Sequence, residues 1–220
     1  VNYEIVYNKF PFLTLYWNTI VVTVVTIAGQ LFIVSLAAYA FARLNFPFKN
    51  ILFIGMLGLM MVPGQIFLIP QFRLMVQMKL TNTLTALVLP SLFSVFGVFL
   101  LRQAFQTIPK DLDEAARMDG CSYFRIYWQI MLPLVTPNLV ALGIMTMLST
   151  WKNLMWPIIV NRSIEKLTLS AGLAMLIGEH TTYYEQVMAG AVISVLPMII
   201  VFMIFQKQFV EGIAKTGVKG

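Results

Sequence analysis

The chain has 220 residues, of which 59% are hydrophobic and 11% are charged, and its formal net charge is +6 at pH 7. Soluble domains carry about 25% charged residues, so this composition excludes an ordinary soluble protein and indicates one that is embedded in a membrane. The positive charge does not indicate nucleic-acid binding, because the 15 lysines and arginines are scattered between apolar runs and form no basic stripe.

Five long stretches without charged residues predict five membrane-spanning helices. The stretches contain 33, 23, 22, 26 and 21 residues. A helix needs about 20 apolar residues to cross a bilayer, so each stretch is long enough. We expect spans at about 14–41, 51–71, 83–105, 127–150 and 187–206. A further run of 12 uncharged residues between Lys166 and Glu179 is too short to cross, and it predicts a surface or re-entrant helix.

Proline interrupts the second and the fourth of these predicted spans. Pro63 (followed by Gly64) and Pro70 lie in the second, and Pro133 and Pro137 lie in the first turns of the fourth. A proline inside a helix frees a carbonyl group and kinks the helix. For the fourth span, a functional bend and an ordinary helix start are both open. For the second, a tolerated kink is favoured over a broken helix that lines a translocation path.

Between the third and fourth spans, residues 109–121 have the pattern of a short amphipathic helix. A proline suits the first turn, acids are favoured near the positive end of the helix dipole, and a glycine is a common stop. These residues are Pro109, then Asp111, Asp113 and Glu114, and finally Gly120. A small apolar face is expected from Leu112, Ala115, Ala116 and Met118. The helix either docks in a groove of a partner or rests on the membrane surface.

The segment after the fourth span is rich in aromatic residues. It carries Trp151, Asn153, Trp156, Tyr183 and Tyr184. Sugars stack on aromatic rings, and an asparagine can bond to hydroxyl groups, so these residues are candidates for a substrate path. The alternative, an aromatic belt at the membrane surface, is favoured because it needs no ligand. The lone His180 has no second histidine near it, so we expect no metal site.

The distribution of basic residues predicts the orientation. Five spans put the two chain ends on opposite sides, and a cytoplasmic C-terminus places nine lysines and arginines in the cytoplasm against six outside. Residues 109–121 are then cytoplasmic. The sequence contains no GxxxxGK[ST] phosphate-binding loop, so any uphill transport must draw its energy from a partner.

The cytoplasmic loop resembles the signature loop of permease subunits of ATP-binding-cassette importers. That pattern is E-A-A, three residues, G, nine residues, I, one residue, and L-P. The matching residues here are Glu114, Ala115, Ala116, Gly120, Ile130, Leu132 and Pro133, with Asp119 and Pro137 also in agreement. Three further segments, AAYAFARLNFP (37–47), MVPGQIFLIP (61–70) and FVEGIAKTGVKG (209–220), are similar to the carbohydrate-importing branch, above all to the smaller permease of maltose-type systems. WKNLMWPIIV (151–160) is also similar, with Lys152 at a usually uncharged position.

The resemblance implies an all-α, polytopic membrane helix bundle with the type I importer permease fold, forming one permease domain over 1–220. Members usually have a sixth, N-terminal span, so we expect either a truncated chain or a five-span version. Residues 109–121 would form the coupling helix, which seats in a cytoplasmic ATPase. By the same resemblance, residues 160–186 would be the periplasmic loop that meets the solute-binding protein. Candidates for that contact are then Trp151, Asn153, Trp156, Tyr183 and Tyr184. The implied partners are a second permease, two ATPase subunits that use ATP and Mg, and an extracytoplasmic solute-binding protein, in the plasma membrane of a prokaryote. This chain would bind no cofactor and carry no catalytic residue.

Two other functions remain as alternatives to sugar import by alternating access. The coupling pattern is common to importers of many solutes, so a permease for a polyamine, phosphate or similar solute is the first. The second is a non-transporting membrane scaffold or channel. Such a protein would have no ATPase partner, and its function would not change when Gly120 is replaced.

Overall fold

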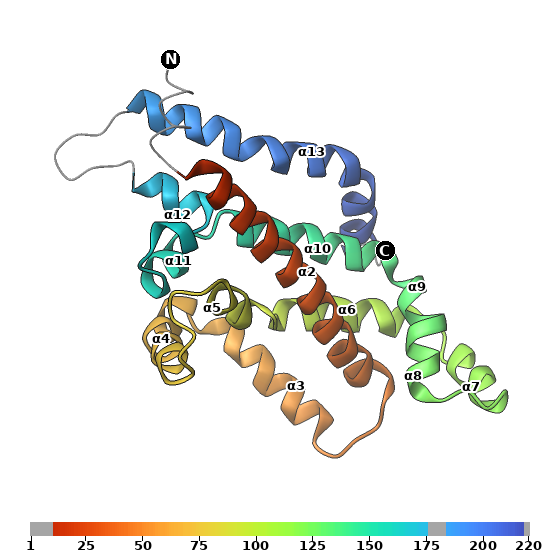
Figure 1. The fold of residues 1–220 in the computed structure, drawn as a ribbon. Helices are drawn as coiled ribbons and strands as arrows, with labels where there is room; N and C mark the ends of the chain where they lie inside the picture. Colours follow the sequence, from red (N-terminus) through yellow and green to blue (C-terminus); the bar gives the residue numbers. More distant parts are fainter. Residues whose placement is uncertain (1–10, 176–183, 218–220) are drawn as a thin grey trace. The chain divides into compact units, whose positions relative to one another are not determined.

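Helices make up the regular structure of the chain (Figure 1). The computed structural model describes the backbone of residues 11–175 and 184–217 and the side chains of 11–175 and 188–206, and no strand occurs within these ranges. The α-helices are α2 (Phe12–Arg43), α3 (Lys49–Gly58), α4 (Leu68–Gln77), α5 (Leu84–Val88), α6 (Val95–Thr107), α7 (Asp111–Met118), α8 (Tyr123–Ile126), α9 (Leu132–Leu134), α10 (Thr136–Trp151), α11 (Met155–Val160), α12 (Leu169–Ala174) and α13 (Tyr184–Gly217). The 3₁₀ turns are η1 (Leu59–Met61), η2 (Gly64–Phe67), η3 (Leu89–Ser91) and η5 (Ile164–Lys166), and η4 (Tyr127–Met131) is a π-helical turn.

Two of the described helical segments are each long and apolar enough to cross a membrane. They are Phe12–Arg43, with 32 residues, and Met188–Gln206, with 19. Three further pairs of helices pass the same test only together, because each pair is bent at a short break. Their bends are 98° between Lys49–Met61 and Gly64–Gln77, 46° between Leu84–Ser91 and Val95–Thr107, and 79° between Tyr123–Leu134 and Thr136–Trp151. Up to five spans result if each bent pair is one span, and the five spans stay a prediction.

The break between Met61 and Gly64, in the second predicted span, has a local cause. Val62 takes an extended conformation, with φ −89° and ψ 123°, directly before Pro63. A residue that precedes proline is driven out of the helical region by the proline ring, so the helix ends there. Pro70 falls in the first turn of α4, where a missing N–H group costs little. The bend therefore depends on Pro63 and not on Pro70.

Two prolines and a π-helical turn surround the bend in the fourth predicted span. The helix turns at Val135, which lies between Pro133 and Pro137. Pro137 has no N–H group to donate to the carbonyl of Pro133, and the hydroxyl of Thr136 donates to that carbonyl instead, at 2.8 Å. Just before the bend, η4 widens the helix so that the Leu132 N–H bonds to the Tyr127 carbonyl. The structure thus has a sharp bend here and not an ordinary helix start.

The chain divides into two compact units, which we describe separately. Unit 1 takes in the described residues of Val1–Ala28, Gly64–Leu92 and Met145–Ile204. One part of its core packs Val22 of α2 against Ala86 of α5 and Trp156 of α11. Polar contacts add to this packing, because the amide of Asn18 donates to the carbonyl groups of Glu165, at 2.7 Å, and Leu167, at 3.0 Å.

The short uncharged run after Lys166 forms α12, which is buried. The described part of this run is therefore not an exposed surface helix, whereas the other alternative, a re-entrant helix, stays a prediction. Leu169 is fully buried, and its N–H donates to the hydroxyl of Thr19 at 2.7 Å. Gly172 lies so close to Leu15 that an added Cβ would be 2.4 Å from a methyl group of that leucine. Only a residue without a side chain allows this close approach of α12 to α2.

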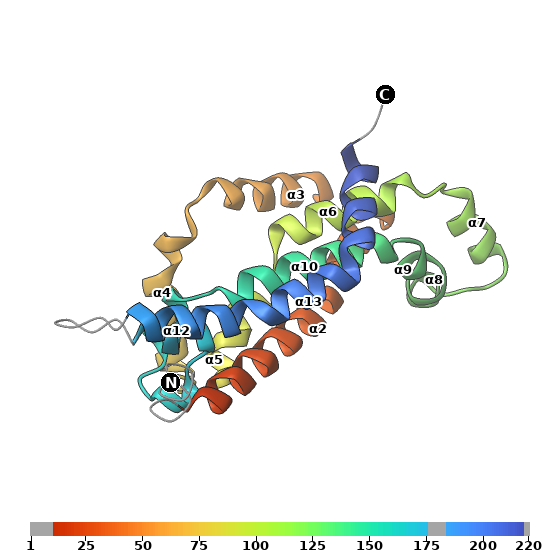
Figure 2. The ribbon, with the colours of Figure 1, turned by 90° about the horizontal axis from the view of Figure 1, so that it is seen from above.

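Unit 2 takes in the described residues of Gly29–Pro63, Phe93–Ile144 and Phe205–Gly220. Its core joins the C-terminal part of α2 to α6, α8 and the N-terminal part of α10. Gly97 of α6 allows the closest approach, since an added Cβ would lie 2.9 Å from Val34 and 3.1 Å from Leu142. At one end of the unit, the short helix α7, which follows α6 and precedes α8 in the chain, lies next to α8 in both views (Figures 1 and 2).

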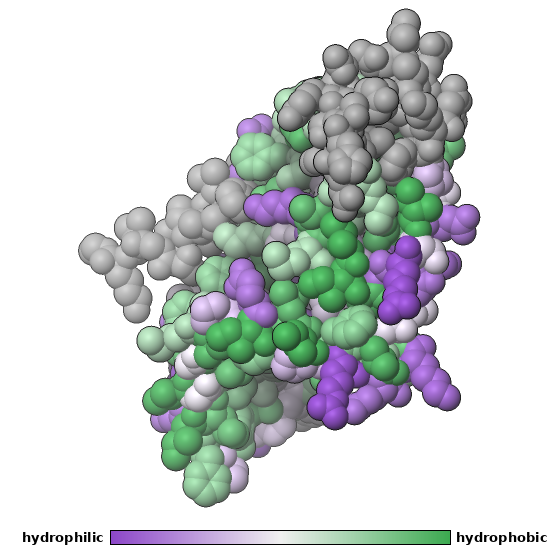
Figure 3. All heavy atoms as spheres, turned by 90° about the vertical axis from the view of Figure 1, so that its left-hand side faces the viewer, coloured by the Kyte–Doolittle hydropathy of each residue, from purple (hydrophilic) through white to green (hydrophobic). Residues whose placement is uncertain are grey.

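Many large apolar side chains are exposed, as expected for a protein in lipid. Ile51, Leu52 and Ile54 of α3 are more than half exposed, and so are Met203 and Ile204 of α13. Apolar residues cover much of the face drawn in Figure 3, with most of the strongly hydrophilic residues on its right-hand side. Apolar patches of this extent are unusual on soluble monomers, so they support membrane embedding.

Candidate functional site

The helix α7 is the described element that carries the most charge and the strongest motif. It runs from Asp111 to Met118, so it is shorter than the expected 109–121. Lys110 precedes it, and the backbone carbonyl of Lys110 accepts hydrogen bonds from the N–H groups of Asp113 and Glu114, at 2.9 and 3.1 Å. Three acids occupy the first turn and Arg117 lies in the last, which suits both ends of the helix dipole.

Gly120 ends this helix in the way that the sequence predicts. Its φ is +79°, a left-handed conformation that a glycine adopts without strain. The Gly120 N–H bonds to the Arg117 carbonyl at 3.0 Å, and the Cys121 N–H bonds to the Ala116 carbonyl at 2.9 Å. These two bonds form a Schellman motif. A Cβ at Gly120 would meet no atom within 4 Å, so the constraint at this position is the backbone angle and not space.

The two sides of α7 have different surroundings. Met118 is 89% exposed and Leu112 is 42% exposed, and Ala115 is exposed as well. Ala116 is only 6% exposed and joins the core of unit 2. The expected single apolar face is therefore corrected, because Ala116 packs inward. Since each residue turns a helix by about 100°, Ala116 lies near Asp113 on the inner side and Met118 points away. Glu114, Asp119 and Gly120 are exposed.

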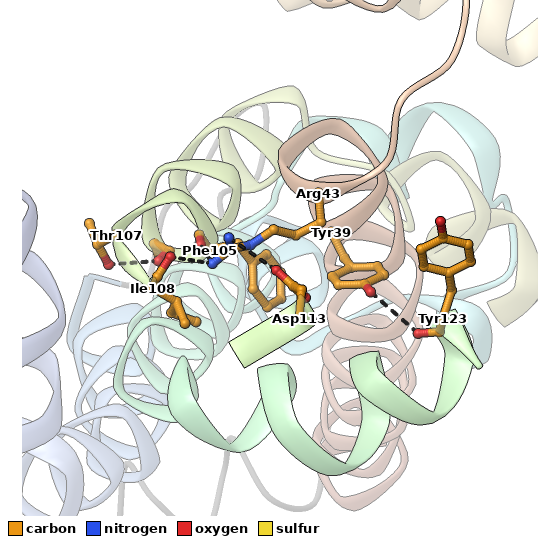
Figure 4. A network of polar contacts seen from close by, with 8 residues as sticks. Tyr39, Arg43, Phe105, Thr107, Ile108, Asp113 and Tyr123 are labelled. Carbon is orange, nitrogen blue, oxygen red and sulfur yellow. Dashed lines mark hydrogen bonds and ion pairs between the residues drawn. The ribbon is translucent and has the colours of Figure 1, made fainter. Parts of the chain in front are cut away.

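Arg43, the last residue of α2, anchors the inner side of α7 (Figure 4). Its Nη1 lies 3.1 Å from Oδ2 of Asp113, and the two side chains are 5% and 19% exposed. Its Nη2 donates to the carbonyl groups of Phe105, at 2.6 Å, and Ile108, at 2.5 Å. Those carbonyl groups end α6, where a cation is favoured by the helix dipole. One buried guanidinium thus joins the ends of α2 and α6 to α7.

Aromatic contacts continue this anchor toward α8. The hydroxyl of Tyr39, one turn before Arg43, donates to the carbonyl of Tyr123 at 3.4 Å (Figure 4). The guanidinium of Arg117 lies over the ring of Tyr123, 4.8 Å from its centre. The last turn of α7, before Gly120, therefore contacts α8 through Arg117, and the start of α8, after Gly120, contacts α2 through Tyr39.

Burial raises the pKa of the Asp113 carboxyl above its ordinary value of 3.8, although Arg43 opposes this shift and Glu114 adds to it. The carboxylate therefore pays a desolvation cost that its ion pair does not fully offset. Oδ1 of Asp113 and Nε of Arg43 are both buried, and neither has a hydrogen-bond partner within the described chain.

Sequence reasoning missed Arg43 and Tyr39 as functional residues and treated Asp113 only as a helix-end acid. Arg43 and Asp113 are 70 positions apart, so no local pattern joins them. A usable signal was the AAYAFARLNFP segment (37–47), which contains both Tyr39 and Arg43 and resembles the carbohydrate-importing branch.

The remaining motif residues lie from η4 to the start of α10, on both sides of the bend at Val135. Ile130 is in η4 and Leu132 begins α9, and both pack against the core of unit 2. Pro133 and Pro137 flank the bend at Val135. The motif therefore runs without interruption from α7 to the bend.

Among the aromatic candidates in the segment after the fourth predicted span, the two whose side chains are described, Trp151 and Trp156, are buried in unit 1. The indole N–H of Trp151 donates to the Ser194 carbonyl at 2.9 Å, and that of Trp156 donates to the Ala86 carbonyl at 2.9 Å. Oδ1 of Asn153 accepts the Trp156 N–H at 3.4 Å. Tyr183 and His180 lie outside the described residues, as does the side chain of Tyr184. Contact of this segment with a solute or a binding protein stays a prediction. Within residues 11–175 and 188–206, no group of three potential metal ligands comes together.

Comparison with known proteins gives a consistent match over nearly the whole chain. Residues 31–215 match the family model described as "Binding-protein-dependent transport system inner membrane component". The arabinooligosaccharides transport system permease protein AraQ of Halalkalibacterium halodurans is 38% identical over 94% of this chain and 75% of that protein. AraQ of Bacillus subtilis is 38% identical over 100% of this chain and 78% of that protein. The sn-glycerol-3-phosphate permease protein UgpE of Yersinia enterocolitica is 32% identical over 95% of this chain and 75% of that protein.

Solved structures agree with this match. A chain of a bacterial ABC transporter involved in the import of the acidic polysaccharide alginate superimposes with a TM-score of 0.84 and 26% identity, covering 94% of this chain and 79% of that chain. The MetNI methionine ABC transporter has a chain that superimposes with a TM-score of 0.65 at 16% identity, which shows a likeness of fold.

Proposed function

Because the chain belongs to the family of binding-protein-dependent transport system inner membrane components, we propose that it is the permease subunit of an ATP-driven importer of a sugar or oligosaccharide. The solute class rests on the two AraQ proteins and on the alginate importer, since each is named for a carbohydrate. The chain is an inner membrane component with no catalytic role of its own, and a separate ATPase hydrolyses ATP with Mg.

The partners in this proposal are a second, different permease, two cytoplasmic ATPase subunits and an extracytoplasmic solute-binding protein. The C-terminus and α7 face the cytoplasm. The observation that carries the proposal is the division of α7 into two sides. Leu112, Ala115 and Met118 are exposed, and the opposite side is fixed to unit 2 by Arg43 and Asp113. A docking helix needs one free side and a rigid base.

Coupling then follows from the contacts of α7. When ATP closes the ATPase dimer, the ATPase pushes on the exposed side of α7. The Arg43 guanidinium passes this displacement to the ends of α2 and α6 through its ion pair and its two carbonyl bonds. The segment from Gly120 to Pro133 passes it to the 79° bend at Val135. Rocking of these helices turns the pathway outward, and hydrolysis resets it.

The test is affinity purification of the tagged chain with its natural partners, comparing Met118→Arg with a matched control. Met78, at the end of α4, is also an exposed methionine at a helix end, with 56% of its surface exposed, so Met78→Arg introduces the same charge elsewhere. We expect Met118→Arg to lose the ATPase and uptake while it still inserts, and Met78→Arg to keep both. Equal recovery of the ATPase with both variants would contradict the docking role of α7.

A second solute class has its own support, because UgpE is named for sn-glycerol-3-phosphate. Its 32% identity is below the 38% of the AraQ proteins, so the carbohydrate comes first. Uptake of labelled arabinooligosaccharide and of labelled sn-glycerol-3-phosphate by the reconstituted importer separates the two.

A further inference from the structure

A large hollow in unit 2 lies beside α7, on its inner side. Its volume is about 1090 Å³, and its walls come from the end of α2, the turn at 44–48, the start of α3, the end of α6, and α7. Five of its lining residues are cationic: Arg43, Lys49, Arg102, Lys110 and Arg117. Two are acidic, Asp113 and Glu114.

The positive charge in this hollow is only partly neutralised within the chain. Arg43 and Asp113 pair with each other. Lys49, Arg102 and Lys110 have no carboxylate within 4.0 Å in the part of the chain that the structure describes. Their other contacts leave charge available, because Nζ of Lys49 uses one donor on the Leu44 carbonyl and Arg102 uses Nε on the Phe41 carbonyl. Clustered cations that outnumber the acids beside them and form no ion pair with them are a binding environment for phosphate oxygens.

The rim of the hollow is apolar on the side of α3. Ile51 lines the hollow and is also 67% exposed, and it continues into the exposed side chains of Leu52 and Ile54. Phe48, also on the rim, is exposed and has φ +59°, a left-handed conformation that costs energy for a bulky residue. Cations beside a lipid-facing apolar helix match the two parts of a phospholipid, its headgroup and its acyl chains.

We propose that this hollow binds the phosphate group of an anionic phospholipid of the cytoplasmic leaflet, with Lys49, Arg102 and Lys110 on the phosphate and the apolar side of α3 along an acyl chain. The choice of the cytoplasmic leaflet rests on the proposed function, in which α7 faces the cytoplasm. A free phosphate has the same headgroup chemistry, but it would make no use of the apolar rim.

The experiment is native mass spectrometry of the purified, delipidated importer complex titrated with phosphatidylglycerol or phosphatidylcholine. The test variant is Lys49→Gln/Lys110→Gln, in which each glutamine keeps a donor but loses the charge. The control is Arg73→Gln/Lys152→Gln, which removes two exposed cations of unit 1 and changes the net charge equally.

We expect the wild type and the control to prefer phosphatidylglycerol over phosphatidylcholine. In the test variant, phosphatidylglycerol should bind about thirty-fold more weakly, since each interfacial cation contributes about 1 kcal/mol and about 1.4 kcal/mol is tenfold. Equal phosphatidylglycerol affinity in both double variants would overturn the site. Displacement of the lipid signal by inorganic phosphate at equal concentration would assign the hollow to a free anion and overturn the lipid. Because binding is measured without transport, a failure here leaves the proposed function untouched.

Discussion

Replacing Arg43 with methionine tests whether one buried side chain holds α7 in place. Methionine keeps much of the length and apolar packing of the arginine stem and removes its charge. The change deletes the ion pair to Asp113 and the two bonds to the carbonyl groups that end α6. We expect α7 to detach from unit 2 more often, while the membrane helices remain folded.

The magnitude follows from the burial of the pair. Removing one partner of a buried ion pair costs about 3–5 kcal/mol, because the other charge stays buried without compensation. Asp113 retains 19% exposure, so water can partly solvate it and the lower end of the range applies. A cost of about 3 kcal/mol raises the population with a detached α7 about 100-fold.

The single cysteine of the chain reports this detachment directly. Cys121 follows Gly120, is half-buried, and packs with Ala116 against the core of unit 2. Its alkylation by a maleimide, read as a mass shift of this chain within the purified complex, measures how often the end of α7 opens. A half-buried thiol also reacts slowly while α7 is attached, and this background reaction makes the rise in the measured rate smaller than the rise of about 100-fold in the detached population. We therefore expect the alkylation rate of Cys121 to rise at least about tenfold.

Arg102→Met is the matched control. Arg102 belongs to the same unit, donates to the Phe41 carbonyl and lies over the ring of Phe53, but it forms no ion pair with α7. Its loss should change the Cys121 rate by less than about threefold. If Arg43→Met alkylates no faster than Arg102→Met, then Arg43 does not hold α7, and the proposed coupling through it fails.

Three further predictions concern single positions. Gly120→Ala should destabilise the end of α7 by about 1–2 kcal/mol through its left-handed backbone alone, seen as faster Cys121 alkylation, and an unchanged rate would contradict the strain. Because the folded-state pKa of Asp113 is raised, the stability that this carboxyl contributes is complete below pH 3.8 and is lost as the pH rises through the folded-state pKa. In the wild type, the melting temperature should therefore fall as the pH rises through this range. The same fall in the Asp113→Asn variant would assign the pH dependence to another group. Gly97→Leu should lower the stability by about 1–3 kcal/mol because an added Cβ would lie 2.9 Å from Val34, whereas Gly55→Leu, with open space around it, should leave the melting temperature nearly unchanged.

Local signals in the sequence were sufficient for α7 and for the apolar helices. The acids of the first turn, the glycine stop and the spacing to Leu132 and Pro133 are all set within a few residues of one another. The structure has the helix and ends it at Gly120 with the bonds that such a stop requires. Charge-free stretches likewise marked helical segments, because the requirement of a bilayer for uncharged length acts on the sequence directly.

Which of the prolines bend or break a helix could be predicted from the sequence only in part. Pro63, Pro70, Pro133 and Pro137 look alike in the sequence. The structure breaks the helix before Pro63 and bends it between Pro133 and Pro137, but it accommodates Pro70 in a first turn. Whether a proline bends a helix depends on where the helix begins, and packing against the rest of the chain sets that beginning.

Other features depended on the tertiary structure alone. Arg43 and Asp113 meet because α2 and α7 pack in one unit, and the burial that results makes the removal of either partner costly. Ala116 faces inward and Met118 outward for the same reason, although both are apolar and lie two positions apart. The sequence by itself determined which segments are helices and which one carries the coupling motif, since periodicity and end signals act over a few residues. Which side of each helix is buried, and which distant charge it meets there, was decided only when the helices packed together.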